Sequence, residues 1–294
     1  MPMAQNVKVV TDSTADIPAD IRAELGIEMV PLKVHVGGET FLDNVTIQPT
    51  AFYERLSRVD KLPTTSQPTP HEFVEMYRKV ATDAACDIVS IHLSQAMSGT
   101  YQSAAMAKEM LVEEGADFAI EVVNGKKASF ATGLIVVAAA EAARAGKTLA
   151  ECRALVERLI DETETYFMVD TLKYLQMGGR IAKASAFLGT LLNIKPILTL
   201  DSDGEVAPEA KARGKKRARK HIFDKLHAYA GDEPVRIGLM HAMVPEEAKQ
   251  LRAMLEEQFN VEQLIETEIG SVIGTHVGPG TVAITIVKSR VVTG

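Results

Sequence analysis

The chain has 294 residues, of which 46% are hydrophobic and 24% charged, and its formal net charge at pH 7 is −7. This composition is that of a soluble globular protein, and the length predicts two domains. The negative charge argues against general affinity for nucleic acid. We find no 18-residue apolar run and no signal-peptide pattern at the amino terminus. Because the chain has only two cysteines, Cys86 and Cys152, which are far apart, we expect a cytoplasmic protein without structural disulfides.

The first half of the chain alternates short apolar runs with helical patterns. Strands are expected at 7–11, 27–36, 87–93 and 118–123, and helices after Pro18 and at 49–57, 70–81, 98–114 and 129–145. A capping box at Thr69 and Glu72 and another at Thr148 and Glu151 each begin a helix, and the second helix runs to about 163. Strands separated by helices imply right-handed crossovers and a largely parallel sheet.

The pattern becomes more mixed beyond that helix, and we place a domain boundary there. Residues 1–160 are expected to form an amino-terminal α/β domain, and residues 161–294 a second, smaller α/β domain. Strands are expected at 165–169, 197–200, 205–207, 235–240, 263–269 and 282–287, and helices at 171–177, 182–193, within the basic run and after Pro245. The glycine-rich stretch 270–280 predicts a loop.

No standard catalytic motif is present: we find no nucleophile elbow, P-loop, zinc-protease helix or dinucleotide fingerprint. Three segments nevertheless gather polar groups. Residues 63–68 hold three hydroxyls between two prolines, residues 94–100 lie between a strand and a helix, and the glycine-rich loop contains His276. Free N–H groups at a helix start, together with hydroxyls, suit an anion, although ordinary capping by Ser98 is an alternative. The turn before Arg180 could aim that side chain at an oxyanion.

Two further features allow a structural and a functional interpretation. Asp12 and Asp16 follow the first strand, where α/β proteins bind ligands; we favour a ligand role for Asp12 and a cap of the next helix for Asp16. In the segment 211–220, seven of ten residues are Lys or Arg. This run is either the solvated start of a helix or a docking patch for an acidic partner.

Taken together in order, several short motifs resemble the DegV family, the fatty-acid-binding subunits of bacterial fatty acid kinases. The resemblance extends from Val7 to about Val287. The motifs are T-D-S-T-A-D at 11–16, T-S-Q-P at 65–68, S-G-T-Y-Q-S-A at 98–104, L-K-Y-L at 172–175 with G-G-R-I at 178–181, K-P-I-L at 195–198, K-A-R at 211–213, and G-T-H with G-P-G within 274–280. The chain departs from the family pattern at Asn124-Gly125, where relatives usually carry Asp-Ser.

The resemblance implies a two-domain fold that encloses the acyl chain near the domain junction. It implies that Thr65, Ser98 and His276 hold the carboxylate, with Ser66 and Gly99 beside them and Arg180 at the same end. It also implies that Arg213, with Lys211 and Lys215, faces a separate ATP-dependent kinase. No catalytic residue, metal or cofactor is then expected in this chain, and the acyl-phosphate would feed phospholipid synthesis. Nucleic acid is not an expected partner, whereas transient membrane contact is compatible with this function.

The apolar lining of such a pocket is expected from residues 128–143 and 186–200, most of which would also form core. Two alternatives belong to other classes of protein. Ser98 and His276 could serve an acyl hydrolase or transferase, although no third member of a triad is evident. The basic run could instead bind nucleic acid, against which the acidic remainder of the chain argues.

Overall fold

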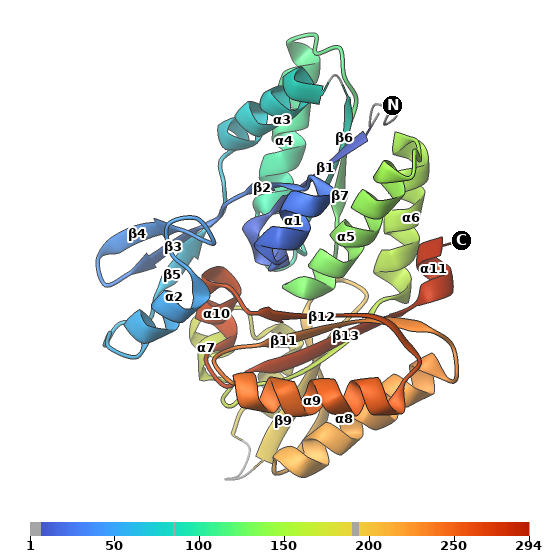
Figure 1. Ribbon diagram of the computed structural model, residues 1–294. Helices are drawn as coiled ribbons and strands as arrows, with labels where there is room; N and C mark the ends of the chain where they lie inside the picture. Colours follow the sequence, from blue (N-terminus) through green and yellow to red (C-terminus); the bar gives the residue numbers. More distant parts are fainter. Residues whose placement is uncertain (1–6, 85, 190–193, 294) are drawn as a thin grey trace.

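Two β-sheets with a layer of helices between them organise the chain (Figure 1). The computed structural model describes residues 7–84, 86–189 and 194–293. In the view of Figure 1 the first sheet lies above and the second below, and a small third sheet projects at the left. No helix in the described ranges is long and apolar enough to cross a membrane.

The first sheet is four-stranded and entirely parallel, as the alternation of strands and helices predicts. Its order is β2-β1-β6-β7. The strands are β1 (Val7–Asp12), β2 (Glu28–Val30), β6 (Asp87–His92) and β7 (Ile120–Asn124), and the helices around it include α1 (Ala19–Leu25), α3 (Pro70–Ala84) and α4 (Thr100–Glu113). A 3₁₀ turn, η1 (Ser13–Ala15), follows β1.

The second sheet has six strands in the order β10-β9-β8-β13-β11-β12. The β11–β12 pair is parallel and the other four pairings are antiparallel. The strands are β8 (Glu164–Met168), β9 (Ile194–Leu200), β10 (Val206–Arg213), β11 (Val235–His241), β12 (Val261–Glu268) and β13 (Val282–Lys288). Helices α8 (Lys215–Ala230) and α9 (Pro245–Gln258) cover its outer face (Figure 1).

Helices α5 (Phe130–Arg144) and α6 (Leu149–Glu162) fill the space between the two sheets. Helix α5 contacts both β1 and β11, and apolar residues are buried all around it, as expected for a helix enclosed on both sides. Most of the segment 128–143 is therefore core, as expected, and only Ala128 and Ser129 of it line the cavity described below. The capping box of α6 is confirmed, and α11 (Ser289–Thr293), which we did not expect, packs against α6.

The segment predicted as one strand at 27–36 is two strands in different sheets. After β2 the chain leaves the first sheet at Pro31 and enters β3 (Lys33–Val36). Proline has no N–H for the ladder, and the next N–H, that of Leu32, donates to Ser13 Oγ at 3.1 Å. The third sheet has the order β4-β3-β5, with β4 at Glu39–Leu42 and β5 at Thr64–Ser66. Helix α2 (Pro49–Leu56) lies between β4 and β5 in the chain.

Three further local predictions need correction. The glycine-rich stretch predicted as a loop contains a helix, α10 (Ser271–Val277). The helix expected at 182–193 is a 3₁₀ turn, η2 (Ala182–Phe187), and positions 190–193 lie outside the described residues. The basic run begins in β10 rather than in a helix, so that α8 starts only at Lys215. The expected short helix is α7 (Lys173–Met177).

Candidate functional site

A largely apolar cavity, partly open to solvent, lies between the second sheet and the loops that follow β6 and β7, and its space of about 890 Å³ includes the part that is open to solvent. Strands β8, β11 and β13, helix α10 and the loops after β6 and β7 supply the walls. The apolar lining residues include Leu32, Leu93, Met97, Phe167, Leu175, Leu200, Val206, Met240, Ile269, Val272 and Ala283. Thr65, Ser98, Arg180 and His276 also line the cavity, so four of the predicted site residues share one space.

Thr65 and His276 are in direct contact although they lie far apart in sequence. Thr65 Oγ1 is 3.0 Å from His276 Nε2. Thr65 is the middle residue of β5, and successive side chains on a strand point to opposite faces. Ser66 accordingly points away from the cavity, and its hydroxyl lies 3.0 Å from His35 Nε2. The structure therefore brings Thr65 into the site and leaves Ser66 behind it.

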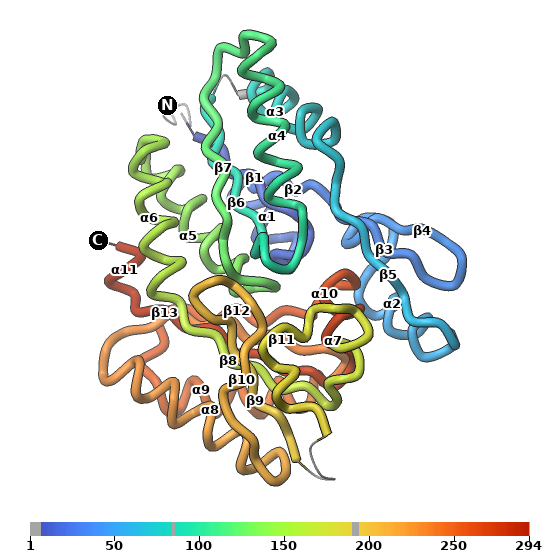
Figure 2. The backbone as a smooth tube through the Cα atoms, turned by 180° about the vertical axis from the view of Figure 1, so that it is seen from behind, coloured from blue at the N-terminus to red at the C-terminus, as the bar shows by residue number. Residues whose placement is uncertain are grey.

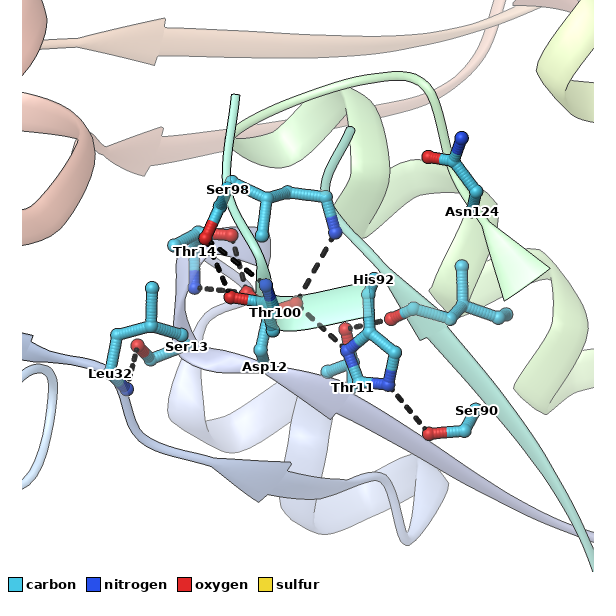
Figure 3. A network of polar contacts seen from close by, with 12 residues as sticks. Thr11, Asp12, Ser13, Thr14, Leu32, Ser90, His92, Ser98, Thr100 and Asn124 are labelled. Carbon is cyan, nitrogen blue, oxygen red and sulfur yellow. Dashed lines mark hydrogen bonds and ion pairs between the residues drawn. The ribbon is translucent and has the colours of Figure 1, made fainter. Parts of the chain in front are cut away.

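Ser98 lines the cavity and also contacts Thr100, the first residue of α4. Its Oγ lies 2.8 Å from Thr100 Oγ1 and accepts a hydrogen bond from the Thr100 N–H at 3.3 Å (Figure 3). Gly99 is not among the lining residues. A Cβ at Gly99 would lie 2.4 Å from Gln67 Nε2, so glycine lets the chain pass close to the T-S-Q-P segment.

Arg180 links the turn after α7 to the loop that carries Ser98. Its Nε donates to the carbonyl of Met97 at 3.1 Å, and its Nη1 donates to the carbonyl of Gly178 at 2.8 Å. Gly178 also lies directly against the histidine, because a Cβ there would be 2.3 Å from His276 Nδ1. Any larger residue at position 178 would displace the imidazole.

The polar end of the cavity carries a neutral histidine beside an arginine. Burial lowers the pKa of His276 to about 4, and the nearby charge of Arg180 acts in the same direction. His276 Nδ1 is buried and has no hydrogen-bond partner among the described residues. An anion placed here would meet the Arg180 guanidinium, the hydroxyls of Thr65 and Ser98 and the imidazole.

We expect His276 to make the lipid-free protein less stable in mild acid. Its ordinary pKa is about 6.5, so between about pH 6.5 and about pH 4 the unfolded chain takes up a proton that the folded imidazole does not. Urea unfolding at about pH 7 and about pH 5 should show a larger loss of stability for the wild type than for His276→Gln. Equal losses would contradict the lowered pKa.

Asp12 does not reach the cavity; it anchors a buried network under the Ser98 loop (Figure 3). Its Oδ2 lies 2.9 Å from His92 Nδ1, and His92 Nε2 lies 2.7 Å from Ser90 Oγ, to which Tyr77 donates. The ligand role favoured for Asp12 is therefore not supported by its position. Sequence reasoning missed His92 altogether, since a histidine at a strand end carries no distinctive spacing.

Asn124, at the departure from the family pattern, holds the loop after β7. Its Oδ1 accepts from the N–H of Gln95 at 3.1 Å and from that of Lys126 at 3.2 Å. The next residue, Gly125, has no room for a side chain, because a Cβ at that position would lie 2.6 Å from the carbonyl oxygen of His92. The Asn-Gly pair thus has a structural role beside the cavity.

The basic residues predicted for docking lie away from the cavity lining, at the end of β10 and the start of α8. Lys211 and Arg213 are exposed on the same face of β10, which is an edge strand. Lys211 Nζ lies 4.6 Å from the centre of the Phe187 ring. Lys215 is paired with Glu247 at 2.7 Å. In the described ranges, no group of three His, Cys, Asp or Glu residues could hold a metal ion.

The comparison with known proteins agrees with this architecture. Residues 6–289 match the family model described as uncharacterised protein, DegV family. A DegV domain-containing protein of Clostridium perfringens is 38% identical over 279 residues, covering 95% of this chain and 97% of that protein. The chain belongs to the DegV family.

Two solved structures of the DegV family are similar over 96% of this chain and 99% of their own. One, titled fatty acid binding of a DegV family protein from Thermus thermophilus, has a TM-score of 0.88 at 37% identity. The other, DegV from Bacillus subtilis, is described as a fatty acid binding protein and has a TM-score of 0.87 at 35% identity. The expected two-domain DegV fold, with its parallel sheet and flanking helices, is thereby confirmed.

Proposed function

We propose that this chain binds one long-chain fatty acid in the cavity and presents its carboxylate to a separate ATP-dependent kinase. The observation that carries the proposal is one apolar cavity whose walls also bear Thr65, Ser98, Arg180 and His276. The solved relatives that are titled as fatty acid binding proteins support it. The fatty acid is the ligand, and we propose no cofactor.

The acyl tail would supply most of the affinity. Burying about fifteen methylenes yields about 12 kcal/mol before the loss of ligand freedom is subtracted. The carboxylate must be desolvated at the polar end, which costs free energy unless donors replace the water. We assign that role to the hydroxyls of Thr65 and Ser98 and to His276, with Arg180 supplying positive charge.

The proposed chemistry belongs to the partner. A carboxylate oxygen would attack the γ-phosphorus of ATP, the bond from that phosphorus to the ADP oxygen would break, and ADP would leave. This chain would hold the resulting acyl-phosphate, which would then enter phospholipid synthesis. Lys211, Arg213 and Lys215 are the proposed docking residues for the kinase.

The hydrogen bonds of the site do not favour the hydrolase or transferase alternative. Ser98 Oγ contacts Thr100, whereas His276 Nε2 contacts Thr65. A serine nucleophile requires a base within hydrogen-bond reach. Among the described residues, Ser98 and His276 do not form such a pair.

The experiment that tests binding is extraction of ligand from the purified protein. The chain is purified from cells without added lipid and denatured, and the extract is analysed by mass spectrometry. We expect about one fatty acid per chain, because a largely apolar cavity shields most of a bound acyl chain from water. A wild-type protein that carries no fatty acid and takes up none from a fatty acid solution would refute the proposed function.

Charge reversal at Arg213 tests the docking proposal separately. Arg213→Glu should lower the rate of kinase-coupled acyl-phosphate formation at least about tenfold at subsaturating carrier, or about 1.4 kcal/mol, because complementary charge assists association. Bound fatty acid should be unchanged. Lys79→Glu, on α3 at the opposite end of the molecule (Figure 2), makes the same change in net charge and should leave the rate unaltered. Equal effects of the two variants would contradict docking at β10.

A further inference from the structure

Two buried carboxylates hold the start of α10, the helix that carries His276. Asp16 Oδ1 accepts from the N–H of Gly270 at 3.0 Å, and Asp43 Oδ1 accepts from the N–H of Ser271 at 2.9 Å and from its hydroxyl at 2.5 Å. Asp16 is 5% exposed and Asp43 1%. The helix therefore has no cap from its own segment and depends on two side chains from the other end of the chain.

Gly270 brings the two acids close together. A Cβ at this residue would lie 2.5 Å from Asp16 Oδ1 and 3.3 Å from Asp43 Oδ1, so both carboxylates converge on one glycine. Asp16 Oδ2 also accepts a hydrogen bond from Ser129 Oγ at 2.5 Å. Asp16 thus ties the loop after β1 to the start of α5 and to the start of α10.

The backbone at this junction is held in a costly conformation. Asp16 has a φ of 49° and Ser129 a φ of 53°, in the left-handed region that non-glycine residues rarely adopt. Such conformations are unfavourable for residues with a side chain and persist where the surrounding structure over-determines them. Ser129 also lines the cavity, so the strained pair lies next to the ligand space.

We propose that Asp16 and Asp43 are positioning residues, which fix the short helix α10 and thereby hold His276 against Thr65 for the carboxylate of the ligand. The inference deepens the proposed function and rests on it for the identity of the ligand. Neither acid touches the ligand in this proposal; both act through α10. A seven-residue helix has little stability of its own, so its orientation follows from its contacts.

The raised pKa values of the Asp16 and Asp43 carboxyl groups agree with a structural role for the two acids. Burial raises the pKa of Asp43 and, together with the charge of Asp43, raises that of Asp16 well above its ordinary value. Among the described residues neither carboxylate is paired with a basic side chain. Asp12 also faces Asp16, and the buried hydroxyl of Tyr53 faces Asp16, Asp43 and Glu268. One proton retained between the two acids would relieve their repulsion and leave acceptors for the α10 amides.

The test uses the titration of His276 in the lipid-free protein, followed by NMR and assigned with His276→Gln. In Asp16→Ala and Asp43→Ala the His276 midpoint should rise at least about one pH unit from about 4 towards its ordinary value, because a released helix exposes the imidazole to water. Arg180, in the turn after α7, and Tyr53, on α2, face α10 and are unchanged in these variants. Asp43→Asn keeps an acceptor for the Ser271 N–H and should restore the wild-type midpoint.

Asp12→Ala is the matched control, since Asp12 is a buried acid at the end of β1 whose hydrogen bonds go to Thr14, His92 and Leu93 and not to α10. It should lower stability without moving the His276 midpoint. If the alanine variants do not fold, Ser271→Ala removes only the hydroxyl contact and should raise the midpoint by a smaller amount. Unchanged midpoints in Ser271→Ala and in the folded alanine variants, or an equal shift in Asp12→Ala, would overturn the proposal.

A second measurement links the pair to ligand. The protein is loaded with fatty acid labelled at the carboxyl carbon. In Asp43→Ala the NMR signal of the bound ligand's carboxyl group should change in chemical shift and in titration. About one ligand per chain should be retained, because the tail supplies the affinity. An unchanged carboxyl signal would contradict the link to the ligand. A wild type that binds no fatty acid would instead refute the proposed function, whereas the lipid-free titration would still decide whether the acids position His276.

Discussion

Replacing Ala283 by phenylalanine should abolish the copurification of fatty acid. Ala283 lies in the middle of a row of cavity-lining residues on three adjacent strands, paired with Phe167 on β8 and with Met240 on β11. Its small side chain leaves the space above the sheet open. A phenyl ring there would obstruct the tail, and excluding about eight methylenes removes about 6 kcal/mol, or a factor of about 10⁴ in affinity.

The measurement is the amount of fatty acid extracted per chain, together with a titration of delipidated protein. Overpacking should cost about 1–3 kcal/mol of stability at most, because the ring enters existing space. Ala154→Phe, at an exposed position of α6, makes the same substitution outside the cavity and should retain about one ligand. If Ala283→Phe binds fatty acid as tightly as the wild type, the ligand does not occupy this cavity.

The parts of the fold that follow from local pattern could be predicted from the sequence. The parallel sheet follows from short apolar strands separated by helices, and the helix boundaries follow from caps such as the box at Thr148 and Glu151. The small third sheet could not be found in this way. Strand β5 is three residues long and lies in a polar, proline-bounded segment, so its alternation, which separates Thr65 from Ser66, has no periodic signal.

Helix α10 shows why part of the site could not be predicted from the sequence. Its glycines suggest a loop, yet Gly274 is where the helix packs against α2: a Cβ there would lie 2.4 Å from the hydroxyl of Tyr53. The caps of the helix are Asp16 and Asp43, more than 200 positions away in the chain. Nothing local in 270–280 encodes either contact. Long-range contacts overrode the local preference for a turn.

Helix α5 illustrates a different limit. Its Ala-rich, apolar sequence indicates that it is covered on all sides, but burial by protein and burial by ligand require the same residue types. Only the placement of the two sheets around the helix shows that protein, and not ligand, buries it. The resemblance to a family, in contrast, named Thr65, Ser98, Arg180 and His276 together, and these four residues line one cavity.

The largest loss of stability is expected from His92→Ala. His92 is fully buried, its ring lies edge-on to Phe73 at 4.9 Å, and its two nitrogens contact Asp12 and Ser90. Removing the imidazole leaves a cavity and a buried carboxylate without one of its partners. Breaking a buried pair of this kind costs about 3–5 kcal/mol, a large share of the 5–15 kcal/mol that stabilises a typical protein.

Urea unfolding measures the effect, and His35→Ala is the control. His35 also makes two hydrogen bonds through its ring, to Thr40 and Ser66, but it is only half-buried on the small third sheet. Water can replace its bonds, so we expect a loss of about 1 kcal/mol or less. Similar losses in the two variants would show that the network of Asp12 and His92 is not an anchor of the first sheet. A selective loss in His92→Ala would instead identify it as the support beneath the loop that carries Ser98, because Asp12 Oδ2 also accepts the N–H of Leu93 at the start of that loop.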